Sequence, residues 1–314
     1  AGAVAKEGGM GVLSTAQIGY DDPDFAKNPE ETNLRVLPEQ IKKAKEIAGG
    51  NGMVAVNIMA VTQLYETYVK TACAAGVDAI ISGAGLPTEL PKFAEGYDVA
   101  LAPIVSSTKS ANVILKFWDK KYHRTADFLV IEGPLAGGHL GFSREQLEDI
   151  PSLDYDTEIQ NIIALKQTYE EKYQTTIPVF VAGGMFTAED ATHVMELGAD
   201  GIQAATRFVA TEECDASDAY KQAYVNASDD DVIIIKSPVG MPGRAIKNAF
   251  IERMLAAPDK ISHCFNCLKA CNPATAPYCI TQALINAVVG DLDNGLIFCG
   301  SRVGEITKIT TVPK

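Results

Sequence analysis

A histidine set among glycines is the first candidate for chemistry in this chain of 314 residues. The segment 132–142 reads EGPLAGGHLGF and follows a short apolar run. Its four glycines allow the backbone to press against a flat ligand. The imidazole of His139 titrates near neutral pH and suits proton transfer. The segment predicts His139 as a general acid or base, and the alternative is a mobile glycine loop with an incidental histidine.

Two further loops rich in small residues predict a phosphate site. The segment 181–185 reads VAGGM, and the segment 200–207 reads DGIQAATR. Each combines an apolar run with small residues and leads toward a helix-like stretch. Small residues let backbone N–H groups approach an anion closely. The alternative is that the glycines only permit tight turns.

A cluster of cysteines near the C-terminus is the third candidate. Four of the seven cysteines, Cys264, Cys267, Cys271 and Cys279, follow the spacing C-x2-C-x3-C-x7-C. Four thiols at such spacing can bind zinc or an iron–sulfur cluster. The alternative is a set of reduced, partly buried thiols, or one fortuitous bridge.

The elements that must position these residues form a repeated strand–helix pattern. Continuous apolar runs, typical of strands buried on both faces of a parallel sheet, lie at 11–15, 53–59, 79–82, 99–105, 128–132, 179–182 and 201–204. Helical patterns with the corresponding start and stop signals lie at 38–47, 61–75, 108–118, 143–147, 187–197 and 244–256. A small residue and an aspartate lead into three of the strands, at Asp78, Asp127 and Asp200.

This pattern predicts a (β/α)₈ barrel, with an open doubly wound sheet as the alternative. Seven strands are visible, and the first strand is expected to be missing because the first residues resemble the end of a helix. Residues 1–210 are predicted to form the barrel. Residues 211–314 are predicted to be a polar insertion, a substrate-side loop and a Cys-rich helical region packed on the barrel.

The composition excludes several classes of partner. The chain is 47% hydrophobic and 21% charged, and its formal net charge is −13. Such an acidic surface repels nucleic acid and anionic lipid. No apolar run approaches the roughly 18–20 residues that span a bilayer. We therefore expect a small-molecule substrate, no nucleic acid or membrane partner, and a cytoplasmic location with reduced thiols.

The glycine-rich segment 131–141 resembles the signature loop of the nitronate monooxygenase (2-nitropropane dioxygenase) family, which includes flavin-dependent enoyl-ACP reductases. The resemblance continues through segments 55–59, 182–185 and 203–208, and it covers roughly residues 1–250. It implies a (β/α)₈ barrel that carries FMN. Two departures are the absence of the family's flavin loop on the first strand, and Ala205 where a glycine is common.

The resemblance also assigns residues to roles. It implies that the FMN phosphate meets the backbone of Gly183, Gly184, Ala205 and Thr206, that Asn57 lies near the flavin and Gly137 and Gly138 along it, and that His139 is the catalytic acid or base. Glu132, Ala182 and Gln203 complete the predicted cofactor contacts. On the loop 236–244, Lys236, Met241 and Arg244 are predicted on the substrate side, with a structured crossover as the alternative.

Three activities remain open from the sequence. The first is oxidation of alkyl nitronates through FMN. The second is reduction of an enoyl thioester with NADH or NADPH as electron donor. The third is a flavin-free barrel enzyme that binds a phosphorylated substrate. A homodimer is also left open.

Overall fold

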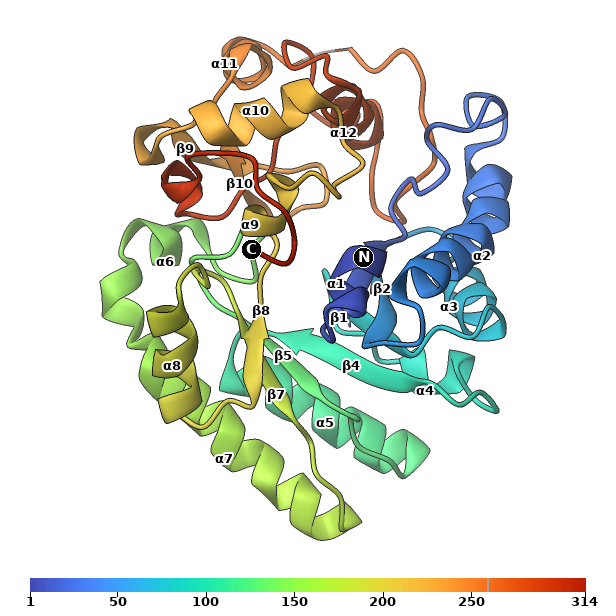
Figure 1. The fold of residues 1–314 in the computed structure, drawn as a ribbon, viewed down its shortest axis with the longest axis vertical. Helices are drawn as coiled ribbons and strands as arrows, with labels where there is room; N and C mark the ends of the chain where they lie inside the picture. Colours follow the sequence, from blue (N-terminus) through green and yellow to red (C-terminus); the bar gives the residue numbers. More distant parts are fainter. Residues whose placement is uncertain (259) are drawn as a thin grey trace. The chain divides into compact units, whose positions relative to one another are not determined.

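The computed structural model describes residues 1–258 and 260–314, and its largest sheet has seven strands in the order β1-β2-β3-β4-β5-β7-β8 (Figure 1). The neighbouring strands from β1 to β5 are parallel. The strands are β1 (Met10–Ser14), β2 (Met53–Met59), β3 (Ala79–Gly83), β4 (Ala100–Val105), β5 (Leu129–Glu132), β7 (Val179–Ala182) and β8 (Gly201–Gln203). Because strands neighbour one another in chain order, the predicted barrel-type α/β class is confirmed.

The aspartates that precede three strands fix the register of the sheet. The carboxylate of Asp78 accepts a hydrogen bond from the backbone N–H of Val54 at 2.7 Å. Asp127 makes the same contact with Leu101 at 2.7 Å, and Asp200 does so with Val179 at 2.8 Å. In each case the aspartate's own N–H donates to the carbonyl of the same partner. Each aspartate therefore clamps the start of its strand to the start of the preceding one.

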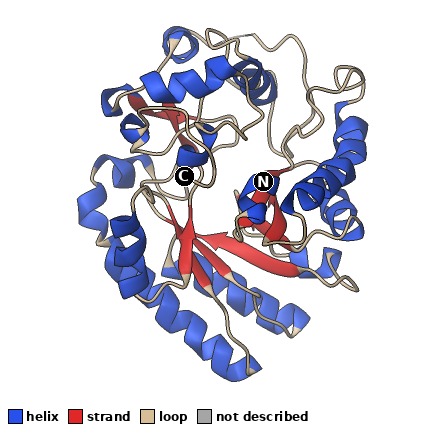
Figure 2. Ribbon diagram, in the orientation of Figure 1, coloured by secondary structure: helices blue, strands red, loops and turns tan. Residues whose placement is uncertain are grey.

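Helices lie in the connections between these strands, and Figure 2 shows them in blue. Ser107 and Ser143 each begin a helix with a capping box, as the spacing of Ser143 and Gln146 predicted. The helices are α1 (Gly2–Lys6), α2 (Pro29–Ala48), α3 (Tyr65–Ala74), α4 (Leu90–Phe93), α5 (Thr108–Tyr122), α6 (Arg144–Glu148), α7 (Tyr155–Tyr173), α8 (Ala188–Glu196), α9 (Thr206–Val209), α10 (Asp218–Asn226), α11 (Ala249–Ala256) and α12 (Ile280–Val289).

Two predicted helix starts are wrong. Helix α2 begins at Pro29, so Pro38 lies inside the helix and not in its first turn. The segment predicted as one helix from Arg244 is divided between the strand β10 (Pro242–Ile246) and α11. In β10 the backbone pairs with β9 (Val232–Lys236), so tertiary pairing overrides the helical pattern.

The chain divides into two compact units that do not follow chain order. The first comprises residues 1–131, 156–180 and 195–201. Its interior contains the fully buried Trp118, whose indole N–H donates to the Pro87 carbonyl at 3.1 Å. Helices α5 and α7 are joined by Lys172 and Tyr173, which both bond to Asp119. The predicted division between residues 210 and 211 stays a prediction.

The second unit comprises residues 132–155, 181–194 and 202–314, with residue 259 outside the description. It contains a three-stranded antiparallel sheet in the order β6-β10-β9, where β6 is Gly138–His139. His139 lies opposite Gly243 in this sheet. A buried cluster that includes Tyr224, Ile297 and Cys299 packs with partly buried residues of α10. The small sheet and this cluster hold the candidate site.

Candidate functional site

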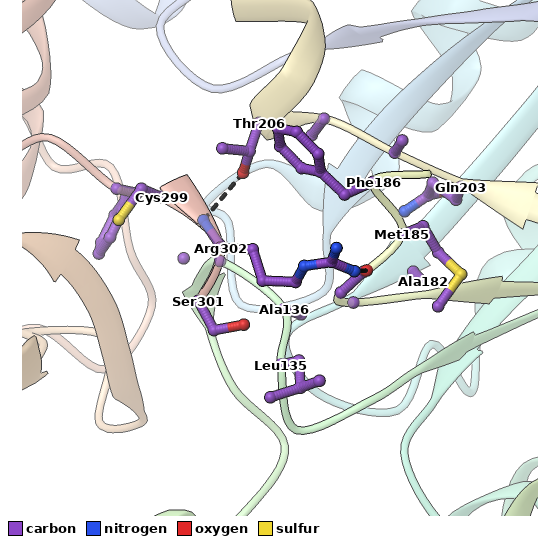
Figure 3. A pocket seen from close by; sticks show the side chains of 18 of the residues that line it. Leu135, Ala136, Ala182, Met185, Phe186, Gln203, Thr206, Cys299, Ser301 and Arg302 are labelled. Atoms are coloured by element: carbon purple, nitrogen blue, oxygen red, sulfur yellow. Dashed lines mark hydrogen bonds between the residues drawn. The ribbon is translucent and has the colours of Figure 1, made fainter. Parts of the chain in front are cut away.

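A pocket of about 280 Å³ in the second unit brings together the predicted cofactor contacts other than Asn57 (Figure 3). The predicted residues that line it are Glu132, Gly137, Gly138, Ala182, Gly183, Gly184, Gln203, Ala205 and Thr206. Its wall also includes Leu135, Ala136, Met185, Phe186, Ala204, Val209, Tyr224, Phe298, Cys299, Gly300, Ser301 and Arg302. The pocket is thus formed where strands β5, β7 and β8 end.

The glycine loop, residues 132–142, is held from behind by Arg244. This side chain is 3% exposed, and its Nη1 donates to the carbonyls of Pro134, at 2.8 Å, and of Ala136. Burial lowers the pKa of Arg244 below its usual value. The loop has further anchors in the Tyr155 hydroxyl, which donates to the Glu132 carbonyl at 2.9 Å, and in the Ser301 N–H. Arg244 thus binds the glycine loop through Nη1, and its contact with a substrate stays a prediction.

Backbone segments that are distant in the sequence approach one another closely around the pocket. A Cβ added at Gly137 would lie 2.5 Å from the carbonyl carbon of Cys299. Gly183 has a φ of +95°, and a Cβ there would lie 2.8 Å from the backbone nitrogen of Ala136. Only glycine fits at these two positions without a shift of the neighbouring chain. The glycine loop and the Gly183 turn are therefore matched to each other.

The opposite wall comes from the segment 298–302, which is tied to the predicted phosphate loops. The Thr206 hydroxyl accepts a hydrogen bond from the Gly300 N–H at 2.8 Å (Figure 3). Arg302 donates to the Gly184 carbonyl at 3.0 Å and to the carboxylate of Asp190 at 2.5 Å. These contacts place a cationic group beside the Gly183-Gly184 turn.

The charge of Arg302 is shared with acidic neighbours. Burial alone would raise the pKa of Asp190, but hydrogen bonds from Thr187, Arg302 and Phe186 outweigh it and lower the pKa below its usual value. Arg302 also pairs with Glu305, and its guanidinium lies 5.6 Å from the centre of the Phe186 ring. The guanidinium is thereby fixed in position.

His139 lies at the edge of the pocket rather than in its lining. Its ring packs edge-on against Phe298, a lining residue, with ring centres 5.0 Å apart. Its Nε2 lies 2.7 Å from the hydroxyl oxygen of Ser237, which is 2% exposed. Burial lowers the pKa of His139 to about 4. The imidazole is therefore neutral near pH 7.

Glu132 is perturbed in the opposite direction. It follows the buried residues of β5 and lines the pocket. Burial raises the pKa of its carboxyl group to about 7. Near neutral pH, a large fraction of Glu132 is therefore protonated. The pocket thus contains the partly protonated carboxyl group of Glu132, at the start of the loop that carries the neutral imidazole of His139.

The hydroxyl of Ser301 lines the pocket and is buried without a hydrogen-bond partner among the described residues. Buried polar groups are usually paired, because an unpaired one costs about 1–3 kcal/mol. A polar ligand in the pocket would remove this cost. Ser301 therefore offers the pocket a hydroxyl group with which a polar ligand can form a hydrogen bond.

Other predicted site residues lie outside this pocket. Asn57 belongs to the first unit, where its carbonyl accepts the hydroxyl hydrogen of Thr15 at 3.0 Å. Lys236 is exposed at the end of β9, and the Met241 carbonyl accepts from the Ser237 N–H at 3.2 Å. Their contact with a cofactor or substrate stays a prediction.

The four C-terminal cysteines carry free thiols. Across residues 1–258 and 260–314, no three His, Cys, Asp or Glu side chains are gathered as they are around a single metal ion. The zinc or cluster prediction at Cys264, Cys267, Cys271 and Cys279 thus has no preformed ion site. The same described residues contain no helix long and apolar enough to cross a membrane.

The sequence reasoning missed two parts of the site. One is Ser237, the partner of His139, although it stands in the loop that was singled out. The other is the wall 298–302, which lies far beyond the resembling region. Its sequence, FCGSR, carries a signal in the small Gly300 followed by polar Ser301, but it lacks the paired glycines of the other loops.

Comparison with known proteins identifies the family of the chain. A probable nitronate monooxygenase of Staphylococcus saprophyticus is 32% identical over 135 residues, which are 43% of this chain and 36% of that protein. A probable nitronate monooxygenase of Staphylococcus aureus is 25% identical over 80% of this chain and 72% of that protein. This first match thus spans about a third of the length of the Staphylococcus saprophyticus protein.

A solved structure is similar over nearly the whole chain. The FabK structure from Thermotoga maritima has a TM-score of 0.72 and 25% identity, and the match covers 99% of this chain and 84% of FabK. The family model of nitronate monooxygenase matches residues 1–314. With the glycine loop, the two small-residue turns and the whole-chain match in agreement, the chain belongs to the nitronate monooxygenase family.

Proposed function

We propose that this chain is an FMN-dependent oxidoreductase that oxidises alkyl nitronates in the pocket of the second unit. The carrying observation is that one pocket collects the glycine loop and both predicted phosphate turns beside a neutral His139. The family membership and the curated relatives, which are named probable nitronate monooxygenases, support the same activity.

The residues of the pocket fit FMN. Backbone N–H groups at Gly183, Gly184, Ala205 and Thr206 would hold its phosphate, and Arg302 adds a cation beside this turn. Gly137 and Gly138 offer a side-chain-free surface to a flat ring. The unpartnered Ser301 hydroxyl offers a hydrogen bond to a polar group. When bound, FMN supplies the electron acceptor that the side chains themselves lack.

The protonation of His139 favours oxidation of an anionic nitronate. A nitronate needs no base before it is oxidised, so a weakly basic imidazole is sufficient. Reduction of an enoyl thioester instead needs a group that delivers a proton to the α-carbon. An imidazole whose pKa is about 4 carries almost no such proton at pH 7. His139 and Ser237 therefore act here as a neutral hydrogen-bonding pair that positions the substrate.

Reduction of an enoyl thioester with NADH or NADPH is the second candidate function. The observation in its favour is the similarity to FabK, a flavin-dependent enoyl-ACP reductase. If this function is correct, Glu132, whose pKa is about 7, is a better proton donor than His139.

Anaerobic mixing distinguishes the two functions. We expect the FMN-loaded protein to lose its flavin absorption rapidly with an alkyl nitronate and slowly with NADH or NADPH. Rapid bleaching by either nicotinamide cofactor and none by the nitronate would establish the reductase instead. A purified chain that takes up no FMN would contradict both functions.

The Gly183→Ala variant tests the placement of FMN. Its new methyl group meets the Ala136 nitrogen, and its φ is unfavourable for alanine. We expect the Kd for FMN to rise roughly tenfold or more, in line with the 1–3 kcal/mol that such strain costs. The matched control is Gly96→Ala, where φ is +85° and nothing lies within 4 Å of the new atom. Equal FMN affinity in both variants would remove Gly183 from the site.

A further inference from the structure

The buried serine beside His139 is held in place by its own turn. Ser237 follows β9 and is 2% exposed. Its backbone N–H donates to the Met241 carbonyl at 3.2 Å, and its carbonyl accepts from the Gly240 N–H at 2.9 Å. Its hydroxyl oxygen accepts from the Val239 N–H at 3.3 Å. This turn therefore fixes both the backbone and the hydroxyl oxygen of Ser237.

The small antiparallel sheet brings His139 to this hydroxyl group. His139 lies on β6, opposite Gly243 of the central strand β10, and Ser237 follows the other outer strand, β9. A Cβ added at Gly243 would lie 3.0 Å from the Phe298 ring, which packs edge-on against the imidazole. The Nε2 atom of His139 lies 2.7 Å from the Ser237 oxygen. The imidazole is thus held between an aromatic ring and a positioned hydroxyl group.

The hydrogen-bonding capacity of this hydroxyl group decides which ring nitrogen of His139 carries the proton. A serine hydroxyl group has one hydrogen to donate and two lone pairs that accept. One lone pair of Ser237 already takes the Val239 N–H. If Nε2 carried the ring proton, it would take the second lone pair, and the serine hydrogen would need another buried acceptor. If Nε2 carries no proton, the serine hydrogen binds it and no donor is left over.

A neighbouring phenol favours the same arrangement. Burial raises the pKa of Tyr278 and the Ser237 hydroxyl group acts in the opposite direction, so the two hydroxyl groups lie near each other. The Tyr278 hydroxyl is buried and forms no hydrogen bond of normal geometry with a described residue. As an acceptor for the Ser237 hydrogen, Tyr278 would leave its own hydrogen unpaired in the interior. As a donor, it would fill the second lone pair of Ser237 and leave the serine hydrogen for Nε2.

The other ring nitrogen of His139 is open. Its Nδ1 forms no hydrogen bond with the described residues and is not among their fully buried polar atoms. The ring is neutral near pH 7, because burial lowers the pKa of His139 to about 4. Phe298, against which the ring packs, lines the pocket of the second unit. At the edge of this pocket, Nδ1 offers either an N–H group or a lone pair, depending on the tautomer.

We propose that Ser237 is a positioning residue that keeps the ring proton of His139 on Nδ1, so that Nδ1 presents an N–H donor to the substrate. The substrate part of this inference rests on the proposed function. A nitronate carries its negative charge on the two oxygens bound to nitrogen, so it pairs with an N–H donor and is repelled by a lone pair. The proton stays on the imidazole throughout. The substrate class that this donor selects is a small, planar oxyanion.

The tautomer of His139 can be measured without turnover. The full chain is labelled with heavy-nitrogen histidine, and two-bond proton–nitrogen correlation spectra are recorded at pH 7 with and without FMN. His139→Gln identifies the signals of this ring among those of the four histidines. We expect the Nδ1–H pattern for His139 in both samples. The Nε2–H pattern in wild type would overturn the proposal, whatever the activity of the protein.

Two variants test the role of the hydroxyl group. Ser237→Ala removes it, and Ser262→Ala is the matched control because Ser262 is exposed. We expect the Nε2–H population of His139 to rise at least severalfold in Ser237→Ala and to stay unchanged in the control. An undiminished Nδ1–H pattern in Ser237→Ala would overturn the proposal. If Ser237→Ala fails to fold, Ser237→Cys replaces it: its weaker donor should still raise the Nε2–H population, and an unchanged population contradicts the proposal.

Binding of a stable oxyanion tests the substrate part. Butyrate has the planar, anionic end of a small alkyl nitronate and serves as the probe. We expect it to shift the Nδ1 proton signal of His139 in the FMN-loaded chain and to bind Ser237→Ala about fivefold more weakly, as measured by titration of the flavin absorption. Equal binding with an unmoved Nδ1 signal would overturn the role of Nδ1 toward the substrate. A chain that takes up no FMN but loses the Nδ1–H pattern in Ser237→Ala would contradict the proposed function alone and support the assignment of Ser237.

Discussion

The glycine loop and the cysteine loop (residues 260–279) are both irregular segments of the same unit, but they are held in different ways. The glycine loop is fixed by polar groups, above all by the buried guanidinium of Arg244 and the Tyr155 hydroxyl. The cysteine loop buries the apolar side chains of Phe265 and Leu268 beside four free thiols. The first loop is therefore held by hydrogen bonds to its backbone, whereas the second is held by apolar packing.

This difference bears on how easily each loop opens. A site whose backbone is already anchored loses little conformational entropy on binding. Local opening is easiest where few backbone groups of a segment are bonded to the rest of the protein. FMN should accordingly change the shape of the glycine loop little, and the cysteine loop should open more readily than the glycine loop.

The largest expected effect comes from removing the anchor of the glycine loop. Arg244→Ala leaves the carbonyls of Pro134 and Ala136 without their buried donor. We expect the free energy of unfolding to fall by about 3 kcal/mol, because bonds to charged donors contribute about 1.5–3 kcal/mol each and are not fully additive. Urea unfolding measures this loss, and FMN retention should fall with it.

Arg144→Ala is the matched control, because that arginine is exposed and pairs with Glu148 on the surface. Its effect should stay below about 0.5 kcal/mol. If Arg244→Ala were as stable as Arg144→Ala and still bound FMN, the glycine loop would not depend on the buried guanidinium.

An effect of at most similar size is expected from the titration of Glu132. Its pKa is about 7 in the folded chain and near 4.5 when unfolded, so the folded state retains the proton more strongly. The stability from this group is complete below pH 4.5 and is lost as pH rises through 7. Glu132→Gln removes this loss. The variant should be more stable than wild type by up to about 3 kcal/mol at pH 8, and this advantage should shrink toward pH 4.5.

His139 gives the opposite pH dependence and serves as the internal comparison. Its pKa is lowered to about 4, so its stabilising contribution is present above 6.5 and is lost as pH falls toward 4. His139→Gln should therefore resist acid better than wild type. Thermal unfolding between pH 4 and 8 measures both slopes, and two flat difference curves would contradict the perturbed pKa values.

The smallest expected effect is a difference in local opening. Trypsin can cut after Lys269 in the cysteine loop and after Arg144 beside the glycine loop, since both side chains are exposed. Cleavage after Lys269 should be roughly tenfold faster than cleavage after Arg144. Equal cleavage rates at both sites would mean that the two loops do not differ in how they are held.

The sequence predicted the strands better than the contacts of charged side chains. Strands 53–59 and 179–182 have the predicted bounds because continuous apolar runs report burial directly. Pro38 was misread because a proline signal does not show whether a helix has already begun. The bond from Arg244 to the glycine loop was not predicted, because residue type does not show whether a guanidinium faces a ligand or a backbone carbonyl.

The pocket was predictable where short motifs carry the backbone shape. Gly137 and Gly183 lack a side chain, which indicates that another backbone segment can approach closely there, and both line the pocket. The wall at 298–302 was not predictable, because its place depends on long-range contacts such as that between Gly300 and Thr206. Such contacts join residues that are 94 positions apart and leave no local pattern.

The aspartate clamps of the first unit have a consequence for how the chain acquires its structure. Each clamp joins positions only 21 to 26 residues apart. Closing a loop of that size costs little entropy compared with joining distant parts of the chain. Each strand–helix–strand unit can therefore fix its own register soon after it leaves the ribosome, before the next unit has been synthesised. The pocket of the second unit needs the wall 298–302, so it is completed only after that late segment has been synthesised.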